Sequence, residues 1–451
     1  MNARLPGLAA RALHPRRYSP QLHFTLLTLL TLLFLLLASG RRAAAATCTL
    51  DSVPAATLLL PYFEVDLDDP NGLTTLFSIN NASATAALTH VVLWSDLAVP
   101  VLDFNVYLTG YDIQTINLRD VLVYGALPQT ASAGQDPRDV ISPKGVVSQD
   151  INYQSCNGQL PPPPLPAALL EGLQLSLTGR ASPLAHNLCS GRYLADNVAR
   201  GYITVDTVNN CTLRFPDEPG YFGASGNSDV TDQNLLWGAW YIVNTARSYA
   251  VASDMVAIEA DAHSAATSTP GRYTFYGRYD GWTAIDHREP LATNFATQYM
   301  NSGGTFPTGT DLIVWRDPKV AQQPFPCPAV PGVTPAWYPL GQEGLTIWDE
   351  EEHPVQQPLI PIEGSPPPFV PFPAATQKVH VNSSDLPVPF SFGWMQIDLN
   401  SANPPAGPNP PVDPPAAQGY VIALHASNGH FAVAVDAYRL DSACAASHFV
   451  P

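Results

Sequence analysis

Apolar and polar residues alternate with a period of two along much of the chain. The clearest case is residues 102–109, where Leu, Phe, Val and Leu alternate with Asp, Asn, Tyr and Thr. This pattern is typical of a β-strand with one buried and one solvent-facing side. It predicts a strand here whose residues Asp103, Asn105, Tyr107 and Thr109 face water.

Similar short runs, separated by turn residues, continue from residue 56 to residue 122 and resume after residue 200. The later runs predict strands at residues 201–208, 235–243, 254–262, 272–279, 311–315, 344–350 and 390–399. Residues 420–438 predict a hairpin, because two alternating runs flank Ser427-Asn428-Gly429. Helical patterns are few. Residues 167–173 follow Pro166, a residue suited to the first position of a helix, and a second short helix is expected at residues 290–300.

The many short strands predict an all-β fold, with one large or two packed antiparallel β-sandwiches, long Pro-rich loops and a few short helices. Proline-rich segments at residues 324–339, 354–373 and 404–415 are expected to form extended loops that pack on the sheets. The expected organisation is a signal peptide at 1–46, an N-terminal β-sandwich region at 47–155, an irregular or helical connector at 156–200, and a second β-rich region at 201–451. We expect the two β-rich regions to pack as one unit.

The first 46 residues have the layout of a signal peptide. They carry six arginines, no acidic residue, and a leucine-rich run from Thr25 to Ala38 that is followed by small residues at Ala43–Ala46. The apolar run is shorter than the ~20 residues that a membrane-spanning helix needs. We expect cleavage after Ala45 or Ala46 and export to the periplasm or the extracellular space, with no integral membrane segment in the mature chain. The alternative is an uncleaved anchor, which the basic pair Arg41-Arg42 would suit.

Cleavage would make an acidic chain more acidic. It would remove six of the 21 basic residues and leave all 38 acidic ones, so the formal charge would change from −17 to −23. A strongly negative field repels phosphate backbones and anionic lipid headgroups. Nucleic acid is therefore not an expected partner, whereas divalent cations, basic proteins and neutral glycans remain open.

The cysteines are far apart and include no C-x-x-C pair, which argues against a zinc site. An even number of cysteines in an exported chain predicts disulfides, here three. The sequence does not decide which pairs form, although a bridge from Cys48 to Cys444 would join the two ends of the fold. The six candidates are Cys48, Cys156, Cys189, Cys211, Cys327 and Cys444.

Two acidic stretches are candidates for a metal site. Glu259, Asp261 and His263 occupy every second position of residues 257–263, so a strand would place them on one face, where they could bind a divalent cation such as calcium. The other interpretation is that they are only the wet face of the strand. The run Asp349–His353 would likewise hold a calcium ion or lie in water as a solvated loop.

Catalytic signatures are absent: the chain has no G-x-S-x-G elbow, H-E-x-x-H pair, Walker loop or Rossmann fingerprint. Aromatic residues that could stack on sugar rings lie near acidic or glycine-rich stretches, but nothing in the sequence fixes a carboxylate pair for glycoside hydrolysis. Trp94, Trp240 and Trp394 fall within strand patterns and are expected in the core. The tryptophans near acidic or glycine-rich stretches are Trp237, Trp240, Trp282, Trp315, Trp337 and Trp348.

Five segments resemble a group of uncharacterised exported bacterial proteins. Three lie near the start of the mature chain, namely LLLPYFEVDL, LTTLFSINNAS and THVVLWSDLAVPVLDFNVYLTGYDIQTINLRD, and two lie toward its end, namely GLTIWDEEEHP and SNGHFAVAVDAYRLDSACAASH. The resemblance implies export and a bacterial source, and it implies no activity and no site residues.

These patterns favour an exported, non-enzymatic structural or interaction protein of the cell envelope or extracellular space, with a protein or glycan partner. The alternative hypothesis is a hydrolase, metal-assisted or carboxylate-based, that acts on extracellular polymers such as glycans.

Overall fold

The computed structural model divides the chain into two compact units, Met1–Ala46 and Thr47–Pro451. All residues that the structure describes belong to the second unit, so the predicted signal peptide lies outside them. The described residues are 52–130, 151, 153–156, 158–223, 228–301, 309–318, 322–331, 344–357, 371–399, 418–427, 430–441 and 444.

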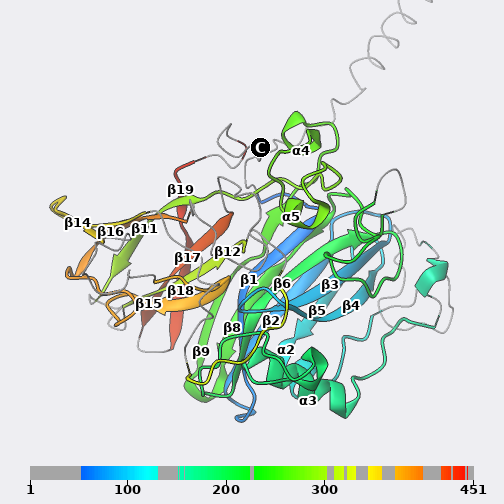
Figure 1. Cartoon of the computed structure of the whole chain (residues 1–451), viewed down its shortest axis with the longest axis horizontal. Coiled ribbons are helices and arrows are strands. Elements are labelled where there is room, and N and C mark those ends of the chain that lie inside the picture. Colours follow the sequence, from blue (N-terminus) through cyan, green and yellow to red (C-terminus); the bar gives the residue numbers. More distant parts are fainter. Residues whose placement is uncertain are drawn as a thin grey trace, which may run out of the picture. The chain divides into compact units, whose positions relative to one another are not determined.

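The fold is all-β, as the alternating pattern predicts, and its strands form three sheets (Figure 1). The first sheet has five strands, which follow the order β10 (Val256–Ile258), β1 (Thr57–Asp66), β6 (Val198–Val208), β3 (Ala87–Ser95) and β4 (Pro100–Leu108). All neighbours in this sheet are antiparallel. Pro61 has no N–H to donate to the ladder, and the register of β1 against β6 shifts between Leu60 and Phe63.

The second sheet also has five strands. Their order is β14 (Pro354–Gln357), β13 (Gly344–Asp349), β16 (Phe392–Asp398), β11 (Asn294–Met300) and β19 (Tyr438–Arg439).

The third sheet has nine strands and joins distant parts of the chain. Its main path is β15 (Thr376–His380), β12 (Thr310–Arg316), β17 (Gly419–Ser427), β18 (Phe431–Asp436), β9 (Tyr249–Asp254), β8 (Ala239–Asn244), β2 (Leu73–Asn81) and β5 (Ile113–Asn117), and β7 (Leu236–Trp237) pairs with β2 outside that path. The contact of β18 with β9 is parallel, and the other pairs are antiparallel.

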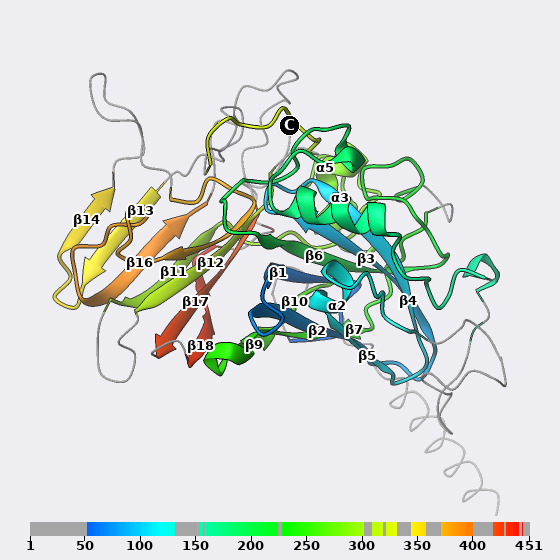
Figure 2. The same cartoon turned by 90° about the horizontal axis from the view of Figure 1, so that it is seen from below.

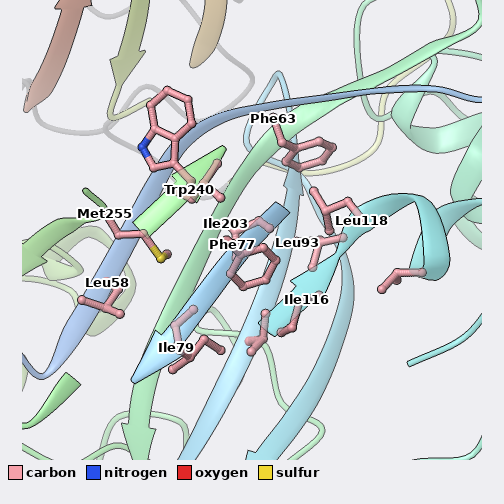
Figure 3. Close-up of a cluster of buried hydrophobic side chains, with 14 of the residues drawn as sticks. Leu58, Phe63, Phe77, Ile79, Leu93, Ile116, Leu118, Ile203, Trp240 and Met255 are labelled. Atoms are coloured by element: carbon pink, nitrogen blue, oxygen red, sulfur yellow. The ribbon is translucent and has the colours of Figure 1, made fainter. Parts of the chain in front are cut away.

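The third sheet packs against both others. Phe77, Ile79 and Trp240 from its β2 and β8 meet Leu93 and Ile203 from the first sheet in one hydrophobic core (Figure 3). At its other half, alternate residues of β12 and β17 pack against β11, β13 and β16 in a separate core. The result is two packed sandwiches that share one sheet, and strands from both predicted β-rich regions stand side by side in it (Figure 2).

Strand β4 shows where the period of two misled the burial prediction. The strand forms as expected, but Asn105 and Tyr107 are buried rather than facing water. A later segment covers them: the Asn105 amide donates to the Thr212 carbonyl at 2.8 Å, and the Tyr107 hydroxyl lies 3.1 Å from the Ile151 carbonyl oxygen.

The helices are short. The helix predicted after Pro166 is confirmed as α3 (Ala167–Leu177), with Pro166 at its N-cap. The helix predicted at 290–300 is wrong, because residues 290–293 are irregular and Asn294–Met300 form β11, whose alternate side chains Phe295, Thr297 and Tyr299 are buried. The strand predicted at 272–279 is also wrong, since it contains the start of a helix. The remaining helices are α2 (Leu118–Leu122), α4 (Ala265–Ser268) and α5 (Gly277–Asp280), with 3-10 turns η1 (Gln154–Cys156), η2 (Pro183–Ala185) and η3 (Thr245–Arg247).

Disulfides connect segments that lie outside the sheet strands. Cys156 bonds to Cys211, and Cys189 bonds to Cys327. Cys444 is also disulfide-bonded, and its predicted partner Cys48 lies outside the described residues. Within the described part of the chain, no helix is long and apolar enough to cross a membrane.

Candidate functional site

A pocket of about 340 Å³ lies where β7, β9, β10, β17 and β18 meet the residues before β1. We call it the Trp237 pocket. Its lining residues are Ser52, Val53, Pro54, Leu58, Trp237, Gly238, Asp254, Met255, Val256, Ala257, Tyr420 and Asp436. Leu58 and Met255 extend the first core into its wall (Figure 3).

Gly238 allows the chain next to Trp237 to run close to β2. A Cβ at residue 238 would lie only 2.3 Å from the Ser78 carbonyl oxygen and 2.8 Å from the Met255 sulfur, so no larger residue fits there. The chain therefore passes closely over β2 between two tryptophans with different environments. Trp240 is fully buried, whereas Trp237 is 48% exposed.

Strand ends supply the polar groups of the pocket. The Trp240 indole N–H donates to the Asp254 carbonyl at 3.1 Å and fixes the end of β9 that carries the Asp254 carboxylate. Asp436 ends β18 and is hydrogen-bonded to the Tyr420 hydroxyl. Burial, and then the negative charge of Asp436, raise the pKa of Tyr420. The phenol stays protonated near neutral pH and donates to the carboxylate.

The Asp436 carboxyl group responds to its surroundings in the pocket. Burial raises the pKa of Asp436, and the nearby Asp254 charge raises it further, while Tyr420 and Arg439 act in the opposite direction. An exposed indole beside such groups offers an apolar surface for the face of a ring and oxygen acceptors for hydroxyl or ammonium donors. The volume is in the range of small-ligand sites, which begins at about 300 Å³.

The predicted metal residues do not share a strand face, because β10 ends at Ile258. Glu259 is buried, and its backbone N–H faces the Glu289 carboxylate at 3.3 Å. Asp261 and His263 lie in the following turn, where the His263 N–H donates to the Asp261 carboxylate at 2.8 Å. Among the described residues, no group of three or more His, Cys, Asp or Glu side chains could hold a metal ion. The divalent cation stays a prediction and is not part of the function that we propose.

The acidic run Asp349–His353 forms the turn between β13 and β14. The Asp349 carboxylate accepts the backbone N–H of Glu351 at 2.9 Å and of His353 at 2.8 Å, and these bonds lower its pKa. The other acidic side chains of the run are exposed.

The tryptophans separate into two groups. Trp94 and Trp240 are buried as predicted, and Trp315 is buried as well. Trp394 is not a core residue: it is 36% exposed and stacks on Trp348 with ring centroids 3.9 Å apart. Trp337 lies outside the described residues.

The most deeply buried charges have structural roles. Arg288, Asp206 and Asp286 have no solvent exposure, and Arg288 forms an ion pair with each of the two aspartates. The hydroxyls of Tyr221 and Tyr276 donate to Asp206 at 2.5 and 3.0 Å. A ligand cannot reach these groups, which join the first sheet to residues 221–288.

Sequence reasoning identified Trp237 as a candidate for glycan stacking but missed Asp254, Tyr420 and Asp436. These three residues are far apart in the sequence and meet through the pairing of β18 with β9. No protein-family model, curated protein or solved structure matches this chain. The resemblance to exported bacterial proteins stays a prediction.

Proposed function

We propose that the chain is an exported, non-enzymatic interaction protein that binds a neutral glycan in the Trp237 pocket. Export is supported by the signal-peptide pattern of residues 1–46 and by disulfides, which persist in oxidising compartments. The resemblance noted above adds a bacterial source and a place in the cell envelope or outside the cell.

The observation that carries the proposal is an indole that is 48% exposed at the edge of a pocket whose charged groups are carboxylates. The C–H face of a sugar ring can pack on Trp237, and its hydroxyls can donate to Asp254 and Asp436. A neutral sugar fits better than an anionic one, because these carboxylates and the acidic chain repel negative charge.

The test is affinity electrophoresis of the disulfide-intact mature protein in gels that contain soluble glucans, xylans, mannans or galactans. We expect at least one neutral polysaccharide to retard the wild type, and we expect Trp237→Ala to remove that retardation. Trp394→Ala is the matched control, since it also removes a partly exposed tryptophan. The proposal fails if no neutral polysaccharide retards the protein, or if Trp237→Ala migrates like the wild type.

A carboxylate-based hydrolase is the second candidate, and one observation favours it. Burial raises the pKa of Asp436, and a second carboxyl group, Asp254, lines the same pocket. A carboxyl group with a raised pKa can act as the acid on a glycosidic bond, and a second carboxylate can act as the base or nucleophile. If the protein is a hydrolase, a polysaccharide that it binds will release reducing ends over time. Asp254→Asn and Asp436→Asn would then stop the release but leave Trp237-dependent binding. Binding without reducing ends would support the non-enzymatic role.

A further inference from the structure

A second pocket, of about 310 Å³, lies among β1, β2, η3, β9, β12, β15 and β17. We call it the Lys378 pocket. Its lining residues are Glu64, Asp66, Leu73, Asn244, Arg247, Tyr249, Asp311, Lys378 and Ala426. No residue is shared with the Trp237 pocket, so the two pockets can bind ligands independently.

Each carboxylate of this pocket already has hydrogen-bond or ion-pair partners within the protein. One oxygen of the buried Glu64 carboxylate binds the Lys378 ammonium group, and the other accepts the Tyr62 hydroxyl at 3.1 Å. Asp66 accepts two backbone N–H groups of the following turn, each at 3.0 Å. Asp311 lies 2.7 Å from the His380 ring nitrogen.

The donor groups of the pocket, by contrast, can still form hydrogen bonds to a ligand. The Lys378 ammonium has three N–H donors, and within the described residues only Glu64 accepts one of them. The Arg247 guanidinium has no hydrogen-bond or ion-pair partner among the described residues, and neither has the Tyr249 hydroxyl. Burial raises the pKa of Tyr249 to about 12, which keeps that hydroxyl a donor at neutral pH.

The loop that carries Arg247 is anchored. The Asn244 side chain caps η3 by accepting the Arg247 backbone N–H at 3.1 Å. The Asn71 carbonyl accepts the Ala246 N–H at 2.9 Å and the Thr245 hydroxyl at 3.0 Å. These bonds hold η3 against the turn between β1 and β2, so Arg247 stands at a defined edge of the pocket.

We infer that the Lys378 pocket binds a small hydroxylated monocarboxylate of the uronic acid class. Its carboxylate accepts from Arg247, Lys378 and Tyr249, since ionised donors and acceptors make the strongest hydrogen bonds. Its hydroxyls donate to the remaining lone pairs of Asp66 and Asp311. A phosphate dianion is disfavoured, because it brings a single hydroxyl where Asp66 and Asp311 both offer acceptors.

The experiment is isothermal titration calorimetry of the disulfide-intact mature protein with D-glucuronate, and with D-glucose and inorganic phosphate as comparison probes. We expect one saturable site for glucuronate and weaker or no binding of the other two. Arg247→Gln should raise the Kd for glucuronate at least tenfold, and Tyr249→Phe should raise it several-fold. Both changes are near the surface and should leave the thermal midpoint unchanged.

Two further variants make the test specific. Arg180→Gln removes an exposed arginine elsewhere and should leave the Kd unchanged. Trp237→Ala should also leave it unchanged, so that failure of the glycan proposal and failure of this one can be distinguished. The inference is overturned if glucuronate shows no saturable binding, if glucose or phosphate binds as tightly, if Arg247→Gln has no effect, or if Trp237→Ala removes the binding.

Discussion

Asp103 on β4 carries a carboxyl group that burial makes hard to ionise. Burial, assisted by the negative charge of Glu218, raises its pKa from 3.8 to about 6. One of its oxygens lies 3.8 Å from the ring nitrogen Nε2 of the fully buried His90, and neither atom has a hydrogen-bond partner in the described part of the chain. The other ring nitrogen of His90 donates to the Asn105 side-chain oxygen at 3.3 Å, so Nε2 is an acceptor when the ring is neutral.

The sign of the pH effect follows from this shift. Between pH 3.8 and 6 the unfolded chain loses the Asp103 proton while the folded chain keeps it, so ionisation at this site destabilises the fold as pH rises. A shift from 3.8 to about 6 corresponds to about 3 kcal/mol of free energy of unfolding, present below pH 3.8 and lost by pH 7. Asp103→Asn removes this loss, because an amide does not ionise and its NH₂ can donate toward His90.

The assay is urea unfolding at pH 4, 5, 6 and 7, followed by tryptophan fluorescence. His90 has a lowered pKa from burial, and its contribution has the opposite sign, so the wild-type curve alone does not isolate Asp103. The difference between variant and wild type does isolate it. The free energy of unfolding of Asp103→Asn, relative to that of the wild type, should increase by about 2–3 kcal/mol from pH 4 to pH 7.

Asp120→Asn removes an exposed carboxylate on α2 and controls for the loss of one negative charge. The reasoning is refuted if the free energies of unfolding of Asp103→Asn and the wild type differ by the same amount at every pH.

Two other predictions concern the stability of the fold. Gly201→Ala should strongly lower the thermal midpoint, because the added Cβ would lie 1.9 Å from the Trp94 carbonyl oxygen. Gly344→Ala is the control and should have a small effect, because its Cβ would lie 3.8 Å from the nearest atom. Similar thermal midpoints for the two variants would contradict this reasoning. Replacing both cysteines of the 189–327 bridge by serine should destabilise more than the same change at 156–211, by about 5 against about 4 kcal/mol, because the bridges span 138 and 55 residues. Calorimetric unfolding without reductant measures both losses, and the reverse order would rule out the loop-entropy argument.

The sequence alone determined the features that depend on neighbouring residues. Alternation of apolar and polar side chains gave the all-β class and strand β4, and Ser427-Asn428-Gly429 gave the β17–β18 hairpin, since a period of two and a turn are local properties. Pro166 marked the start of α3 for the same reason.

Tertiary structure decided what depends on partners far away in the chain. Asn105 and Tyr107 sit at polar positions of a strand and are buried because residues 151–222 happen to cover them. Strand β6 inserts between β1 and β3, and the cysteines pair across 55 and 138 residues; neither arrangement follows from local spacing. Asp254 and Asp436 line one pocket because β9 pairs with β18. Periodicity specifies which side of a strand is apolar, but the strand that pairs with it is chosen by the packing of the whole chain.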